Sequence, residues 1–236
     1  MAKLNGARLL WISVLHLALA VVAARPQDAR LGTEAAAALG YFPPSELASA
    51  GTALARLRPP RLRPELRARI MATLPAEGEL TPSAEERAKL AAADPILAFH
   101  DRTGAVEVKL IEVFGAFVGL HGRSVVLVSR PALTVLSAAE FQALVAHELG
   151  HDYFWEEYER AAAKKDRRVI RELELRCDAI ALLTLRAIKL DTTALGSALA
   201  KISRFNARFG TPPDVDKYVS DAERFRFHGA FLSLCR

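Results

Sequence analysis

The chain has 236 residues, of which 51% are hydrophobic, and a formal net charge of +5 at pH 7. This length and hydrophobic content exclude a disordered tail and suffice for one domain with a buried core, or one domain with an appendage. The charge falls to +3 without the first 24 residues, which contain Lys3 and Arg8 and no acidic residue. So small an excess of positive charge does not indicate a nucleic-acid partner.

Residues 1–24 have the three parts of an export signal. Lys3 and Arg8 form a basic start, an apolar run of 16 residues follows, and Val22 and Ala24 fit a small-residue cleavage site. We expect cleavage after Ala24 and a periplasmic or secreted mature protein. The alternative is an uncleaved membrane anchor, although this run is shorter than the roughly 20 residues that span a bilayer.

Residues 25–94 combine an Ala-rich helical pattern with two Pro pairs. We expect a helical lead-in that is either packed on the following domain or loosely tethered to it, and the sequence leaves open whether this lead-in is a propeptide or a lid. Its segment 56–69 contains six arginines and one acidic residue, Glu65. We interpret these arginines as a solvated helix face, with a weak contact to an anionic membrane surface as the alternative.

After the lead-in, the pattern changes to strands. Val106, Val108 and Leu110 alternate with charged residues, which is the period of a half-buried strand. The turn sequences RTG and HGR separate successive apolar runs. We therefore expect a small sheet with antiparallel pairing, with His100 and His121 at its turns as surface or capping residues.

The sequence SAAEFQALVAHELGH predicts a helix with a metal site. Ser137 and Glu140 form a capping box, which marks the start of the helix. His147 and His151 are four residues apart, so both imidazoles lie on one face and can bind one ion. Zinc accepts two histidines from one helix face and takes its further ligands from elsewhere. Glu148 lies on the neighbouring flank, where it reaches a metal-bound water as a general base.

A second apolar helix, LELRCDAIALLTLRAIKL, offers the third protein ligand. Glu174 and Asp178 are four residues apart and share one face of this helix. We assign Glu174 to the metal, which leaves the fourth position for water. Asp178 is expected to hydrogen-bond the other nitrogen of a ligating histidine. The alternatives are Glu172 as the ligand, although it faces elsewhere, and a merely solvated acidic stripe.

These motifs resemble the gluzincin metallopeptidases, namely the type 1 CAAX prenyl proteases and the bacterial HtpX-like proteases, which include smaller exported soluble members. The resemblance covers roughly residues 95–228. It is carried by HELGH, by the spacing from Arg171 through Glu174 to Asp178, and by GAFVGLHGRSVVLVSRPALTVLSAAEF. It implies an α+β, zincin-like domain over residues 95–236, mostly helical, with a small antiparallel-containing sheet beside the HExxH helix.

The resemblance also implies a zinc-dependent metalloendopeptidase that binds one Zn²⁺ per chain. By this similarity, zinc is held by His147, His151 and Glu174, with Glu148 as general base and Asp178 as support for a ligand. The expected substrate is an unfolded or extended polypeptide, bound by strand addition along FVGL or VVLVS.

Two positions depart from the family pattern. Gly115 stands where the family often has Asn, and Tyr218 and Val219 stand where many members have a His-Pro pair before an acidic-Arg pair. A Tyr hydroxyl can donate to a developing oxyanion. We therefore expect Tyr218 to stabilise the oxyanion, with Arg224 as the alternative donor.

Two further questions stay open at this point. The first is function, because a catalytically silent zinc-binding or chaperone-like module with a structural metal fits the same motif. The second is whether Cys177 and Cys235 pair, since an exported protein meets conditions that permit disulfides. The sequence predicts neither the cleavage specificity nor the oligomeric state.

Overall fold

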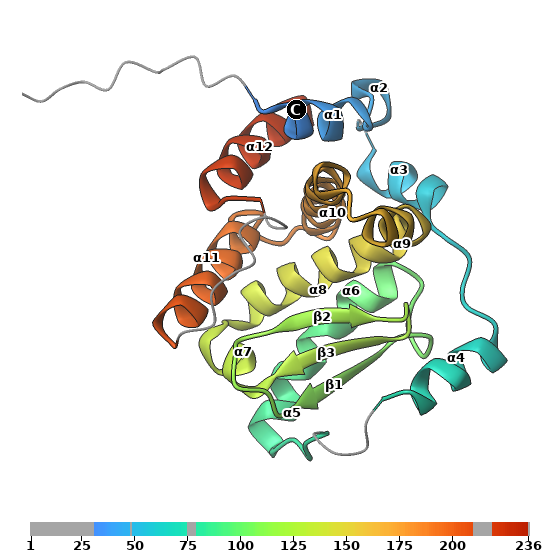
Figure 1. The fold of residues 1–236 in the computed structure, drawn as a ribbon, viewed down its shortest axis with the longest axis vertical. Coiled ribbons are helices and arrows are strands. Elements are labelled where there is room, and N and C mark those ends of the chain that lie inside the picture. The colour runs from blue at the N-terminus through green and yellow to red at the C-terminus, as the bar shows by residue number, and fades with distance from the viewer. Residues whose placement is uncertain (1–30, 48, 75–78, 210–218, 236) are drawn as a thin grey trace, which may run out of the picture. The chain divides into compact units, whose positions relative to one another are not determined.

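The computed structural model describes residues 31–47, 49–74, 79–209 and 219–235 (Figure 1). The predicted signal peptide at residues 1–24 lies outside the described residues, and so does Tyr218. Leu31–Arg236 form one compact unit. The described part is mostly helical with one small mixed sheet, so the predicted α+β class is confirmed.

The elements follow one another along the chain without a repeat. Their bounds are α1 (Thr33–Gly40), α2 (Pro44–Leu47), α3 (Ala50–Leu57), α4 (Pro64–Ala72), α5 (Ala84–Leu90), a 3-10 turn (Ala91–Ala93), α6 (Asp94–Phe99), β1 (Glu107–Ile111), β2 (Val118–His121), β3 (Val125–Ser129), α7 (Arg130–Val135), α8 (Ala138–Tyr153), α9 (Trp155–Lys164), α10 (Arg167–Ala187), α11 (Thr193–Arg208) and α12 (Asp221–Leu234). In the described part of the chain, no helix is both long enough and apolar enough to cross a membrane.

The sheet has the strand order β1-β3-β2. β2 and β3 form an antiparallel hairpin, and its turn residues Gly122 and Arg123 both have positive φ, as a two-residue primed turn requires. β1 runs parallel to β3. The expectation of antiparallel pairing is therefore wrong for β1, because alternation along a strand reports which side chains are buried and not the direction of the neighbouring strand.

Helices α8 and α10 cross at the centre of the fold, where Gly150 of α8 meets Cys177 of α10. A Cβ atom on Gly150 would lie 2.8 Å from the Cα atom of Cys177. The glycine is thus required for the close approach of the two helices. The thiols of Cys177 and Cys235 are both free and buried, so the structure contains no bond between them.

The capping box predicted at the start of α8 is present. The Ser137 hydroxyl accepts from the backbone N–H of Glu140 at 3.2 Å, and the Glu140 carboxylate accepts from the N–H of Ser137 at 2.7 Å. Glu140 also accepts from Ser197 and Lys201 of α11. The start of the metal helix is therefore fixed both locally and by a neighbouring helix.

The lead-in packs on the rest of the unit from residue 31 onward. α1 and α3 lie against α10, and Ala35, Ala38 and Leu54 are fully buried there. Three arginines of the lead-in donate to backbone carbonyls of the segment before β1: Arg58 to Phe99, Arg61 to Asp101 and Arg67 to Ala105. These three side chains hold the lead-in to the domain. The interpretation of the arginines as a merely solvated helix face is therefore incomplete for these three.

His100 is buried, which corrects its prediction as a surface or capping residue. Only 1% of the residue is exposed. Its Nδ1 lies 2.8 Å from the Tyr153 hydroxyl, and its Nε2 lies 2.9 Å from the Thr184 hydroxyl. Burial, with the nearby positive charges of Arg58 and Arg102, lowers the pKa of His100 to about 3, so the ring is neutral.

Candidate metal centre

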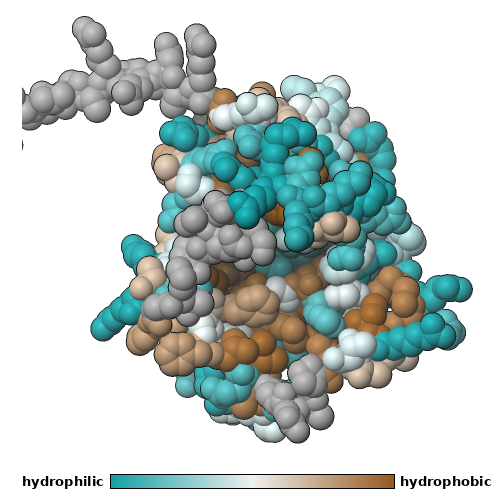
Figure 2. Space-filling view, in the orientation of Figure 1, coloured by the Kyte–Doolittle hydropathy of each residue, from teal (hydrophilic) through white to brown (hydrophobic). Residues whose placement is uncertain are grey.

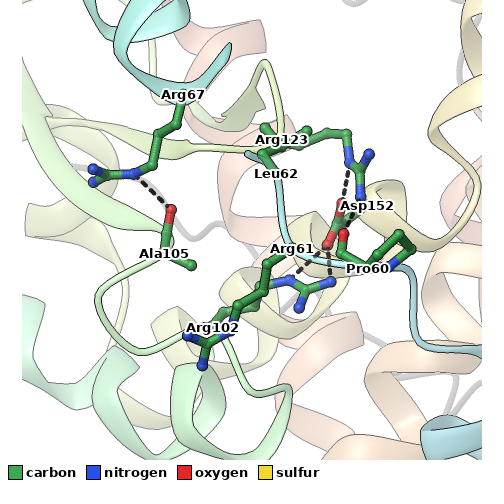
Figure 3. Close-up of a pocket in the computed structure, with 8 residues that line it drawn as sticks. All are labelled: Pro60, Arg61, Leu62, Arg67, Arg102, Ala105, Arg123 and Asp152. Atoms are coloured by element: carbon green, nitrogen blue, oxygen red, sulfur yellow. Dashed lines mark hydrogen bonds and ion pairs between the residues drawn. The ribbon is translucent and has the colours of Figure 1, made fainter. Parts of the chain in front are cut away.

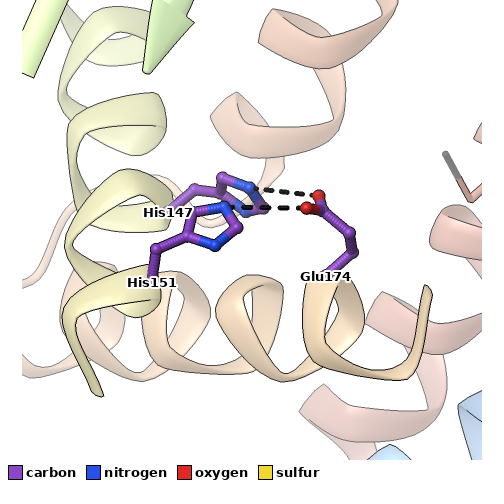
Figure 4. Close-up of side chains that lie close together, drawn as sticks. All are labelled: His147, His151 and Glu174. Carbon is purple, nitrogen blue, oxygen red and sulfur yellow. Dashed lines mark ion pairs between the residues drawn. The ribbon is translucent and has the colours of Figure 1, made fainter. Parts of the chain in front are cut away.

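Three side chains from two helices converge beside the crossing of α8 and α10. Figure 4 shows the imidazoles of His147 and His151, one turn apart on α8, turned toward the carboxylate of Glu174 on α10. Nε2 of His147 lies 3.6 Å from Oε2 of Glu174, and Nε2 of His151 lies 3.7 Å from Oε1. One ligand atom from each residue lies within 4.8 Å of the other two.

These distances fit a shared metal ion. They are too long for hydrogen bonds between the groups themselves. Donor atoms at about 2.0–2.1 Å from one tetrahedral ion are separated by roughly 3.3–3.4 Å, which is close to the observed spacing. The group can therefore hold a metal ion, and two imidazoles with one carboxylate are ligands that zinc and several other transition metals accept.

A second layer of side chains orients the ligands. Nδ1 of His147 lies 2.8 Å from Oδ1 of Asp178, which is fully buried. Arg224 of α12 donates to Asp178 and, at 3.0 Å, to Oε2 of Glu174. Nε2 of His228, one turn further along α12, lies 2.9 Å from Oδ2 of Asp178. Both carboxylates of α10 thus have a partner on α12 as well as a histidine of α8 nearby.

The electrostatics of the site favour bound positive charge. Burial alone would lower the pKa of His147, but the carboxylates of Asp178 and Glu174 raise it to about 10. Burial would raise the pKa of Glu174, but His147, His151 and Arg224 lower it to about 2. Both shifts arise because buried carboxylates require a positive partner, and a cation between the three ligands would meet the same requirement.

Glu148 lies next to the ligands and contacts the sheet. Its Oε2 accepts from the backbone N–H of Leu120 on β2 at 2.9 Å. Only 8% of the residue is exposed, and burial raises the pKa of its carboxyl above the usual value, although the neighbouring histidines oppose this shift. The carboxyl is therefore positioned by β2 and more basic than an exposed glutamate.

The other residues considered from the sequence, Arg224 and Glu172, lie outside the group of three candidate ligands. Arg224 is buried against Glu174 and Asp178, and each of its terminal nitrogens donates a hydrogen bond to one of these carboxylates. Glu172 pairs with Arg176 of its own helix and is not part of the ligand group. Sequence reasoning missed His228, although its position one turn after Arg224 places both residues on one face of α12.

The residue that follows the second histidine is fixed by a separate ion-pair cluster (Figure 3). Asp152, which is 3% exposed, lies 2.7 Å from a terminal nitrogen of Arg102 and 2.5 Å from Nε of Arg123. The same two arginines donate to the carbonyls of Pro59 and Pro60 in the lead-in. The cavity at this cluster has a volume of about 10 Å³, which is at the lower limit for one water molecule and too small for a larger ligand.

A larger groove lies between α11 and α12. Its volume is about 540 Å³, and its walls are mainly apolar, with Leu199 and Ala200 on one side and Phe225 on the other. Arg224 and His228 also line it, so the groove adjoins the side chains that support the metal ligands.

Comparisons with known proteins do not assign this chain to a family. A scan of protein-family models finds no match, and a search of curated proteins finds none. The assignment of a function therefore depends on the residues of the site and their chemistry.

Proposed function

We propose that this protein is a zinc-dependent metalloendopeptidase with a zincin-like catalytic domain. The observation that carries the proposal is the convergence of His147, His151 and Glu174 on one point, with Glu148 beside them. Two histidines from one helix turn, a carboxylate from a second helix and an adjacent glutamate are the donor set and base of a hydrolytic zinc site.

Each residue has one role in the proposed reaction. Bound zinc would supply Lewis acidity, which acidifies water and polarises a peptide carbonyl. Glu148 removes the proton of the attacking water and returns it to the leaving amine. Asp178 orients His147, and Arg224 keeps the carboxylates of Glu174 and Asp178 in place.

The edge strand β2 suits an extended polypeptide substrate. Leu120 directs its N–H to Glu148 and away from β3, and strand alternation turns the backbone groups of Val118 to the same side. A peptide added along this edge would therefore pass the proposed base. Of the two segments predicted for strand addition, FVGL leads into the edge strand β2, whereas VVLVS is the central strand β3 and has no free edge.

A second candidate function is a zinc-binding module without catalysis, in which the metal is structural. The observation in its favour is the position of Arg224, whose terminal nitrogens are both bonded to carboxylates and so do not face a substrate. The two functions differ in their requirement for Glu148, because a structural site needs the ligands but no base.

The test measures metal content and casein cleavage for the wild type and for Glu148→Gln. We expect one zinc per chain in both proteins and a loss of cleavage of about 10²–10⁴-fold in the variant. Glu172→Gln, a change at a carboxylate outside the ligand group, is the matched control and should cleave normally. Zinc without cleavage in the wild type would favour the structural module, and a wild type without zinc would refute both functions.

The proposed place of action is the periplasm or the cell exterior. The support is the basic start, apolar run and small-residue site in residues 1–24. The mass of the protein recovered from cells tests this proposal. A mass that corresponds to a chain starting at Arg25 supports export with cleavage. The mass of the full-length chain, found in the membrane fraction, supports the uncleaved anchor.

A further inference from the structure

An exposed aromatic cluster lies where the loop between β1 and β2 meets the end of α11. Phe114 is 76% exposed and Phe209 is 46% exposed, and their ring centroids are 6.4 Å apart at right angles. Val113 and Phe117, at 39% and 44% exposure, flank Phe114 on the loop. We call these four residues the aromatic surface. Figure 2 shows hydrophobic side chains gathered over the strands, below the more hydrophilic surface of the helices above them.

Hydrogen bonds hold the part of the loop beside Phe117 to two neighbouring elements. The side-chain amide of Asn206 accepts from the N–H of Ala116 at 2.8 Å and donates to the carbonyl of the same residue at 3.0 Å. The N–H of Phe117 donates to the Ser129 hydroxyl at 2.8 Å, and its carbonyl accepts from the N–H of Ser129. Ala116 and Phe117 at the end of this loop are therefore bonded to α11 and to the end of β3.

The backbone of β2 leaves space for the ring of Phe117. A Cβ atom on Gly119 would lie 2.4 Å from this ring, so only glycine lets the ring lie across the strand. Phe205 packs under Phe209 with ring centroids 4.5 Å apart. A ring that packs against its neighbours, as those of Phe117 and Phe209 do, loses less conformational entropy when it binds a partner.

The aromatic surface is continuous with the strand that contacts the proposed base. Phe117 directly precedes β2, and Leu120, three residues further on, donates to Glu148. Three residues of strand correspond to about 10 Å. A polypeptide extended along β2 would therefore contact the base and the aromatic surface at the same time.

We propose that the aromatic surface binds aromatic and aliphatic side chains of an unfolded polypeptide. This inference rests on the proposed function in one respect, since it assumes that the polypeptide lies along β2. Exposed apolar clusters on a folded protein mark binding sites. Folded substrates bury such side chains, so the surface would select polypeptides that have lost their structure. Arg208, which is exposed at the end of α11 and lies 5.7 Å from the centroid of the Phe209 ring, would favour acidic residues in the same polypeptide.

The test measures binding in the Glu148→Gln background, so that cleavage does not remove the ligand. The probes are two fluorescein-labelled unstructured peptides that differ only in carrying Phe or Ala at their apolar positions, and the readout is fluorescence anisotropy. We expect the double variant Phe114→Ser/Phe209→Ser to bind the Phe peptide about tenfold more weakly, with unchanged thermal unfolding and metal content. Leu66→Ser, a change at a 41% exposed leucine of α4, is the control and should bind normally.

Three results would overturn the inference. The first is equal binding of the Phe peptide by the double variant and its parent. The second is binding to phosphatidylcholine–phosphatidylglycerol vesicles that the double variant loses while peptide binding stays, which would assign the surface to a lipid bilayer. The third is self-association of the parent that the double variant abolishes without any effect on peptide binding.

Casein cleavage by the wild type separates this inference from the proposed function. If the wild type does not cleave casein but the double variant still loses binding of the Phe peptide, the aromatic surface is supported and the peptidase assignment fails. If the wild type cleaves casein and the double variant binds normally, the peptidase stands and the aromatic surface does not bind substrate.

Discussion

At the scale of single residues, the candidate metal site consists of three candidate ligands and of the side chains that orient them. Asp178 has partners on both oxygens, because His147 and Arg224 lie at Oδ1 and His228 lies at Oδ2. Groups of this kind set the orientation of a ligating imidazole, and their loss commonly weakens metal binding without removing it.

His228→Asn is therefore expected to weaken zinc binding by about tenfold, because Asp178 loses a partner that orients it toward His147. Competition with a chromogenic chelator measures the affinity. The control is Gly229→Ala on the same helix, where an added Cβ meets nothing within 4 Å. Equal affinity in the His228 variant and the wild type would show that Arg224 alone is enough to hold Asp178.

His100 makes the stability of the fold depend on pH. Its pKa is about 3 in the folded state, below the ordinary value of 6.5, so its contribution is fully present above pH 6.5 and declines as the pH falls toward 3. Between pH 7 and pH 5 this decline is about 2 kcal/mol. Denaturant unfolding at both pH values should show a smaller decline for His100→Gln than for the wild type. Equal declines in the two proteins would contradict the buried, neutral state of His100.

At the scale of elements, the crossing of α8 and α10 brings the two histidines of α8 close to Glu174 of α10. Gly150 lies one residue before His151, and Cys177 lies three residues after Glu174. The contact at this crossing thus sets the distance between the histidines and the carboxylate.

Gly150→Ala is expected to destabilise the protein by about 1–3 kcal/mol and to lower its zinc affinity, because the added methyl group pushes the helices apart. Gly51→Ala in α3 is the matched control. A Cβ there meets nothing within 4 Å, so the change should be neutral or stabilising by up to about 1 kcal/mol. Thermal unfolding and chelator competition measure both effects, and equal stabilities of the two variants would exclude a tight crossing.

At the scale of the whole molecule, the lead-in shares one hydrophobic core with the rest of the unit, to which it contributes Ala35, Ala38 and Leu54. Asp152 links them, because Arg102 and Arg123 bind both this carboxylate and the carbonyls of Pro59 and Pro60. The described part of the lead-in is thus packed on, and hydrogen-bonded to, the unit that contains the candidate metal site.

Asp152→Asn is expected to cost about 3–5 kcal/mol, because it leaves the buried guanidinium of Arg102 without its charged partner. The control is Asp101→Asn, which removes an exposed ion pair to Arg61 and should change stability little. Limited proteolysis should cut the lead-in of the Asp152 variant faster than that of the control. Equal proteolysis in both variants would contradict the role of Asp152 in holding the lead-in.

The sequence alone determined the features that depend on short-range geometry. These are the capping box at Ser137, the placement of His147 and His151 on one helix face, and the placement of Glu174 and Asp178 on another, because helical periodicity relates residues three or four apart. Tertiary structure alone decided the direction of β1, the burial of His100, the partners of Asp152 and the contact of Asp178 with His228. These features join residues that are far apart in the sequence or depend on how strands and helices pack, and periodicity carries no information about either.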